Sequence, residues 1–245
     1  MVRQHRTLKL ETLETRTVLS GTPIEVPTEV VERVPIQAFM NSAQLGDVTV
    51  LTASTTEHGR ELFAVNADGE FSLLSDLRVG SEGSSIQNWA VIGDHVYFEA
   101  NDGTGRSGYR TDGTVEGTEL LSESRGRGAS DFVAIGNTLY YNSGGLKYRP
   151  LTGSGATGSV PGELIATVND RAILRASNGA GTRTINLQTF RPDEGVLPLS
   201  DKAFGLTVTV VGTINDQLLF VGATPDDGKE LWVTDGSPFL SLIHI

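Results

Sequence analysis

The sequence predicts an all-β fold built from about five repeats of one small unit. Three observations predict this fold. A short turn motif recurs along the chain, glycine accounts for 29 of the 245 residues, and long runs of Ala, Leu, Glu and Lys are missing. Glycine-rich chains with short strands suit antiparallel sheets, because tight hairpins need residues that tolerate positive φ. The lack of helix-forming runs argues against a helical bundle.

The recurring turn motif consists of an apolar residue, then Gly or Asn, then Asp or Asn, one variable residue and an apolar strand. Its turn residue is Asp47, Asp94, Asn137, Asp170 and Asp216 in successive copies, so the gaps between copies are 47, 43, 33 and 46 residues. A period of about 45 residues with about four short strands per unit is typical of a β-propeller blade. The short third gap predicts a contracted unit around residues 140–161. We therefore predict a β-propeller-like array of about five repeats, incomplete at the C-terminus.

A second motif follows the first and predicts a further strand in each unit. It occurs at residues 59–65, 109–114 and 228–236, with degenerate copies at 146–149 and 184–187. Asp-Gly pairs come after this strand at residues 68–69, 112–113 and 235–236. Each pair predicts a hairpin turn that joins the strand to the next one.

Three runs of residues resemble the ELWxxDGT repeat family. Residues 230–237, ELWVTDGS, fit the repeat at every position but the last, and residues 109–118, YRTDGTVEGT, match its second half, D-G-T-x-x-G-T. Residues 76–85, DLRVGSEGSS, resemble the linker D-I-x-P-G-x-x-G-S-S that follows it, with Val79 in place of proline. The resemblance covers roughly residues 37–237 and is specific in three units. The resemblance implies tandem blades in large exported bacterial proteins. It assigns no catalytic residue to this chain.

Residues 1–21 precede the repeats and form an N-terminal segment of their own. The segment begins with basic residues, but it lacks the unbroken apolar stretch of roughly 7–15 residues that a secretory signal contains. Residues 13–20, LETRTVLS, resemble the LEPR-XLL segment near the start of exported or surface proteins of certain bacteria, with Thr15 in place of Pro and Val18 in place of Leu. This resemblance implies an extracellular or cell-surface location, with the periplasm as the alternative.

The regions on either side of the repeats differ from them in pattern. Residues 22–35 carry Pro23, Pro27 and Pro35 among alternating Val, Ile and Glu, which predicts an extended linker or an edge strand. The repeats then occupy residues 36–237. Residues 238–245, PFLSLIHI, abandon the pattern, and we interpret them as the product of a truncated reading frame.

The last repeat has no convincing sequence for its outer strand. A propeller removes its exposed sheet edges by pairing its last blade with its first. We therefore expect an open or strained array that is marginally stable and self-associates. The alternative is that residues 24–34, in which Val and Glu alternate with period two, supply the missing strand.

Composition excludes several functional classes. The net charge is −11, and the basic residues are scattered, so the chain lacks the clustered Lys and Arg that bind nucleic acid. The chain has no cysteine, which excludes disulfides, thiolate zinc sites and cysteine nucleophiles. No apolar run approaches the roughly 20 residues that span a bilayer.

Two kinds of loop could bind small ligands. Residues 103–108 and 153–158 match G-x-G-x-x-G, but neither run precedes a helical pattern, so we interpret both as loops and predict no cofactor. The acidic loops at residues 101–103 and 226–228 could offer oxygen ligands to Ca²⁺. Asp and Asn before Gly are also ordinary turn formers, and the turn is the favoured interpretation.

Catalytic signatures are missing from the sequence. Neither G-x-S-x-G nor H-E-x-x-H occurs, and the four histidines are not spaced as metal ligands, so we predict surface imidazoles: His5, His58, His95 and His244. The strand aromatics could line a carbohydrate groove, but we predict that they form the core between blades: Trp89, Tyr97, Phe98, Tyr140, Tyr141, Phe220 and Trp232.

These observations favour a non-enzymatic exported or surface repeat protein that acts as a scaffold or as a binding and adhesion module for an unidentified protein or carbohydrate. One alternative is a propeller-type polysaccharide lyase or hydrolase with ionisable side chains converging at one mouth of the ring. Another is a periplasmic assembly propeller that recruits other proteins. Propellers can build enzyme sites from many loops, so the lack of motifs does not exclude the first alternative.

Overall fold

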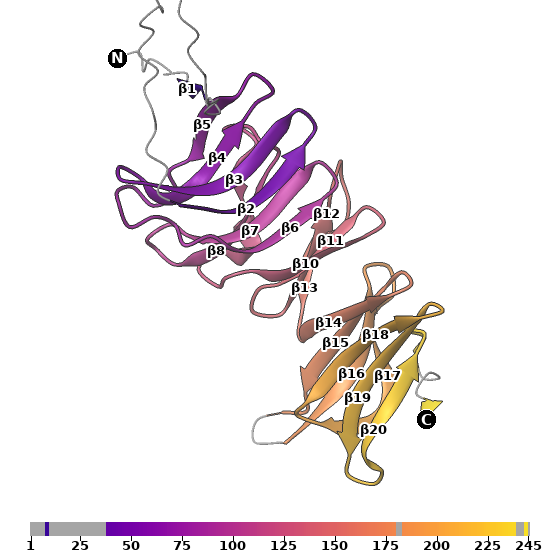
Figure 1. Cartoon of the computed structure of the whole chain (residues 1–245). Coiled ribbons are helices and arrows are strands. Elements are labelled where there is room, and N and C mark those ends of the chain that lie inside the picture. Colours follow the sequence, from indigo (N-terminus) through magenta and orange to yellow (C-terminus); the bar gives the residue numbers. More distant parts are fainter. Residues whose placement is uncertain (1–7, 10–37, 180–182, 239–242, 245) are drawn as a thin grey trace, which may run out of the picture. The chain divides into compact units, whose positions relative to one another are not determined.

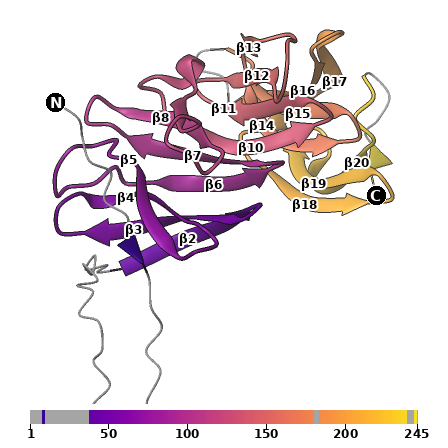
Figure 2. The same ribbon diagram turned by 90° about the horizontal axis from the view of Figure 1, so that it is seen from above.

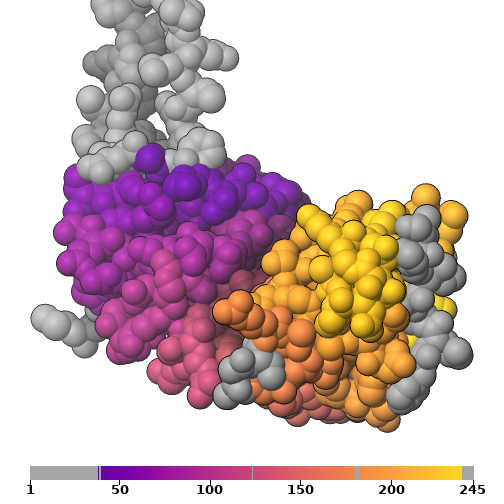
Figure 3. All heavy atoms as spheres, turned by 90° about the horizontal axis from the view of Figure 1, so that it is seen from below, coloured from indigo at the N-terminus to yellow at the C-terminus, as the bar shows by residue number. Residues whose placement is uncertain are grey.

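The computed structural model describes residues 8–9, 38–179, 183–238 and 243–244, and Figure 3 shows the other residues in grey. The described residues form five antiparallel sheets and one short 3-10 helix, η1 (Ser122–Ser124) (Figures 1 and 2). This confirms the predicted all-β, propeller-like array of five repeats. The chain divides into two compact units, residues 1–126 and 127–245.

The N-terminal unit contains the first two sheets. The first sheet has the strand order β1-β5-β4-β3-β2 and consists of β1 (Leu8–Lys9), β2 (Ala38–Leu45), β3 (Val48–Thr55), β4 (Gly59–Val65) and β5 (Glu70–Ser75). The second sheet follows the order of the sequence and consists of β6 (Gln87–Ile92), β7 (His95–Asn101), β8 (Arg106–Thr111) and β9 (Glu119–Leu120).

The C-terminal unit contains three sheets, each in sequence order. The third consists of β10 (Ser130–Ile135), β11 (Thr138–Asn142), β12 (Leu146–Pro150) and β13 (Gly158–Val160), and its short strands confirm the contracted unit. The fourth consists of β14 (Glu163–Val168), β15 (Arg171–Ser177), β16 (Thr184–Arg191) and β17 (Gly195–Gly205). The fifth consists of β18 (Val208–Ile214), β19 (Gln217–Thr224), β20 (Gly228–Thr234) and β21 (Ile243–His244).

The recurring turn motif joins the first two long strands of every sheet. The residue before the turn Asp or Asn has a positive φ in all five copies: Gly46 (57°), Gly93 (61°), Gly136 (56°), Asn169 (52°) and Asn215 (47°). Every one of these strand pairs also contains a register shift, between residues 39 and 42, 87 and 90, 130 and 133, 164 and 166, and 210 and 212. The five sheets therefore share a β-bulge that the sequence did not reveal.

Alternating residues after the turn pack against opposite neighbours, because successive side chains of a strand point to opposite faces. In the fourth sheet, Leu174 at the fourth position after Asp170 packs with Tyr140 of the third sheet. Its neighbour Ile173 packs with Phe220 of the fifth sheet. We call these two sides the preceding face and the following face of a sheet. Phe98 of the second sheet follows the same rule and packs with the first sheet.

The strand aromatics form this core, as predicted. The buried side chains with at most 2% exposure include Tyr97, Phe98, Tyr140, Tyr141, Phe220 and Trp232. Trp89 is half-buried, and its ring centre lies 6.4 Å from that of Phe98. The aromatic side chains are therefore interior, and the carbohydrate-groove alternative is not supported for them.

Two details differ from the sequence-based expectations. Ile243 and His244 pair with Val233 and Trp232, so the tail outside the repeat pattern supplies a fourth strand that was not predicted. Backbone pairing does not require a strong side-chain pattern in a two-residue strand. The Asp112-Gly113 and Asp235-Gly236 pairs do not form tight hairpins. They begin the longer connections 112–118, between β8 and β9, and 235–242, between β20 and β21. The predicted linker at residues 22–35 lies outside the described residues.

Candidate functional site

The side chain of Glu61 in β4 connects the first sheet to the linker that leads to the second. Glu61 is fully buried, and its carboxylate accepts hydrogen bonds from the Leu77 N–H (3.3 Å), the Arg78 N–H (3.3 Å) and the Ser84 hydroxyl (2.7 Å). Burial raises the pKa of Glu61 to about 7, and the charge of Asp76 adds to the rise, although the hydrogen bonds lower it. Glu61 belongs to the second recurring motif, where it corresponds to Glu230 of the last repeat.

Ser84 in the linker joins the two sheets of the N-terminal unit. Its N–H donates to the carbonyl of Arg60 in β4 (3.0 Å), and its own carbonyl accepts from the N–H of Asn101 in β7 (2.7 Å). The linker can approach β4 this closely because two glycines face each other. A Cβ on Gly59 would lie 2.5 Å from the Gly83 nitrogen, and both glycines have a positive φ. The Gly and Ser positions of the linker pattern thus have structural roles.

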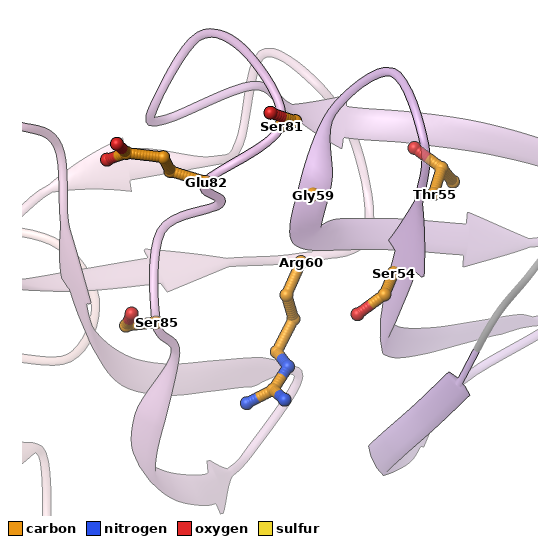
Figure 4. Close-up of a pocket in the computed structure, with 7 residues that line it drawn as sticks. All are labelled: Ser54, Thr55, Gly59, Arg60, Ser81, Glu82 and Ser85. Atoms are coloured by element: carbon orange, nitrogen blue, oxygen red, sulfur yellow. The ribbon is translucent and has the colours of Figure 1, made fainter.

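The linker and the β3–β4 hairpin enclose a polar pocket of about 280 Å³ (Figure 4). Its lining consists of Ser54, Thr55, Gly59, Arg60, Ser81, Glu82 and Ser85. The Arg60 side chain extends between the hydroxyl of Ser54 and the linker segment that carries Ser85, whereas the Glu82 carboxylate points away from it (Figure 4).

Arg60 is the charged group of this pocket that is available to a ligand. Glu82 forms an ion pair with Arg78. Within the described part of the chain, no carboxylate lies within ion-pair distance of the Arg60 guanidinium. The pocket therefore combines the guanidinium of the half-buried Arg60 with serine and threonine hydroxyls, which can bind an anionic group and neighbouring hydroxyls.

His58 lies next to the pocket and corrects the prediction of a surface imidazole. Its Nδ1 lies 2.9 Å from Asp76 Oδ2, and its backbone N–H donates to the Thr55 hydroxyl (3.0 Å). His95 is also mostly buried, with its Nδ1 2.6 Å from Asp94. The sequence could not reveal the first pair, because Asp76 follows His58 by 18 residues and approaches it only when the linker folds back. His5 lies outside the described residues.

The acidic loops hold turns, as their favoured interpretation predicted. The Asp102 carboxylate accepts from the Thr104 N–H (2.9 Å) and hydroxyl (2.6 Å), and these bonds lower the pKa of Asp102. Asp227 pairs with the Lys202 amine (2.6 Å). Among the described residues, no group of three or more His, Asp or Glu side chains is arranged to hold a metal ion.

The D-G-T-x-x-G-T run forms a loop that is held by its own hydrogen bonds. The Asp112 carboxylate accepts from the Thr114 N–H (2.9 Å) and hydroxyl (2.7 Å), and the Thr118 hydroxyl lies 2.7 Å from that of Thr111. A Cβ on Gly117 would clash with the Asp112 carboxylate. No helix follows either G-x-G-x-x-G run, as predicted: β8 begins within the first run, and β13 begins at the last glycine of the second.

The described residues contain no helix that is long and apolar enough to cross a membrane. A comparison of the chain with models of known protein families and with curated protein sequences finds no match.

Proposed function

We propose that the chain is a non-enzymatic, exported or cell-surface repeat protein of the ELWxxDGT type, which serves as a scaffold and binds an acidic carbohydrate in the pocket beside Arg60. The observation that carries this proposal is the polar pocket itself, which is built by a repeat linker rather than by an insertion. The polar residues Glu61, Ser84 and Asp112 support the scaffold role, because they hold a linker and a loop in place.

The chemistry of the pocket supports an acidic saccharide as the ligand. A guanidinium forms bidentate hydrogen bonds with a carboxylate or a sulfate. The hydroxyls of Ser54, Ser81 and Ser85 can each donate and accept, as sugar hydroxyls also do. The volume of about 280 Å³ accommodates one or two sugar rings of a longer chain, so an internal part of a polysaccharide fits.

Arg60→Gln is expected to weaken binding of a galacturonate oligosaccharide at least about tenfold, because a charge-assisted hydrogen bond is lost. The matched control is Arg125→Gln, which removes the same charge from an exposed position in the same unit. Isothermal titration calorimetry at low ionic strength would measure both, with an uncharged glucose oligosaccharide of equal length as the ligand control. Equal affinities for the two variants, or no binding by the unmodified chain, would refute the proposal.

The His58–Asp76 pair favours a second candidate function, a polysaccharide lyase or hydrolase. A histidine held by a carboxylate can act as a general base, and this pair adjoins the pocket. The two functions differ in turnover. Binding alone leaves the galacturonate oligosaccharide intact, whereas an enzyme releases shorter or unsaturated products that disappear in His58→Ala.

A further inference from the structure

The preceding face of the first sheet is buried although no other sheet of the described chain comes before it. By the alternation that orders the other sheets, this face carries Leu51 and Ala53, the fourth and sixth residues after Asp47. Phe63 pairs with Leu51 in register and lies on the same face, where its ring stacks on Phe71 with ring centres 4.6 Å apart. Ala53, Phe63 and Phe71 are only 1%, 3% and 4% exposed.

The chain segment that precedes β2 is attached to both edges of the first sheet. Leu8 and Lys9 pair with β5 at one edge, and β2 begins at Ala38 at the opposite edge. The following face is already occupied by the second sheet, whose Phe98 packs against it. Residues 10–37 must connect the two edges. Their 28 residues exceed the sheet width of about 19 Å several times over, so they can cross the preceding face.

The sequence of this connection has one apolar side when it is extended. Even-numbered positions from 24 to 36 carry Ile24, Val26, Thr28, Val30, Glu32, Val34 and Ile36, whereas the odd-numbered positions carry Glu25, Pro27, Glu29, Val31, Arg33 and Pro35. Prolines cannot donate to a sheet ladder, so a segment with two of them suits a sheet face better than a place inside the sheet.

We propose that residues 24–36 lie extended across the preceding face of the first sheet, with their even-numbered side chains against Phe63 and Phe71. They take the place that a neighbouring sheet takes on the same face of the second, fourth and fifth sheets. The segment thereby caps the first repeat, which would otherwise expose a stacked aromatic pair.

Disulfide trapping tests this proposal cleanly because the chain has no cysteine of its own. Leu51→Cys places one thiol on the face, and a second cysteine replaces Val26, Val30 or Val34 in turn. The matched controls place it at the odd-numbered neighbours Glu25, Glu29 and Arg33. After mild oxidation of the full chain, we expect at least one even-numbered position to form an intramolecular disulfide several-fold more than its odd-numbered neighbours, as measured by mass spectrometry.

Three outcomes would overturn the proposal. They are no crosslink at any position, equal yields at even and odd positions, and crosslinks mainly between two chains, which would make a second copy the occupant. The unmodified chain provides a check that does not depend on how the variants fold. Nuclear Overhauser effects between the methyl groups of Val26, Val30 or Val34 and the rings of Phe63 and Phe71 are expected, and their absence would contradict the proposal.

Discussion

Replacement of Trp232 by alanine is expected to lower the free energy of unfolding by about 3–5 kcal/mol, as loss of a large buried aromatic side chain typically does. Trp232 is 1% exposed and lies between the fourth and fifth sheets, with its ring centre 5.4 Å from that of Phe204. Its indole N–H donates to the Gly222 carbonyl (3.1 Å). Truncation would therefore leave a cavity and remove this hydrogen bond.

Denaturant unfolding followed by circular dichroism would measure this loss. Val211→Ala is the control, because Val211 is 60% exposed and belongs to the same sheet. Its replacement is expected to change the free energy of unfolding by less than about 0.5 kcal/mol. Equal effects of the two substitutions would show that Trp232 is not packed between sheets, and would restore it as a candidate for a binding groove.

Glu61 is expected to make the stability of the chain depend on pH between about 4.5 and about 7. Its pKa rises from 4.5 to about 7 on folding, because burial disfavours the charged carboxylate. Between these values the folded chain binds a proton that the unfolded chain does not, so the free energy of unfolding falls as pH rises. The total loss is about 3 kcal/mol, since one pKa unit corresponds to about 1.4 kcal/mol. The stabilising contribution is complete below pH 4.5 and is lost above pH 7.

Glu61→Gln separates this contribution from that of the other carboxylates. The glutamine amide cannot ionise, and its oxygen can still accept from the Leu77 or Arg78 N–H. From pH 4.5 to pH 8, the unfolding free energy of the unmodified chain should therefore fall by about 3 kcal/mol relative to that of this variant. Parallel pH profiles would show that the Glu61 carboxyl titrates normally in the folded chain.

The sequence predicted the repeats well because turn chemistry is local. A Gly or Asn before Asp47, Asp94 or Asp216 is needed wherever the backbone takes a positive φ, so the residue type records the turn directly. The burial of Tyr97 and Phe98 followed from the alternation of side chains along a strand. The third and fourth sheets were recognisable by the same signals, although the second motif is degenerate in both.

The candidate site could be predicted only in part, because its contacts connect residues far apart in the chain. The second motif contains Glu61, and the run that resembles the repeat linker contains Ser84, but neither pattern indicated the hydrogen bond between them across 23 residues. The pocket around Arg60 likewise requires the linker to fold back on the β3–β4 hairpin. Strands β1 and β21 were missed because two residues carry no detectable period.

The alternation of packing between neighbouring sheets defines the repeat fold, and two adjacent residues test it most directly. Ile173 and Leu174 follow each other in β15 but pack in different clusters. In a methyl- and aromatic-resolved nuclear Overhauser spectrum, Ile173 should contact Leu218, Phe220 or Trp232 of the fifth sheet. Leu174 should contact Tyr140 or Leu146 of the third sheet. Contacts from both residues to the same sheet would contradict the stacked-repeat fold.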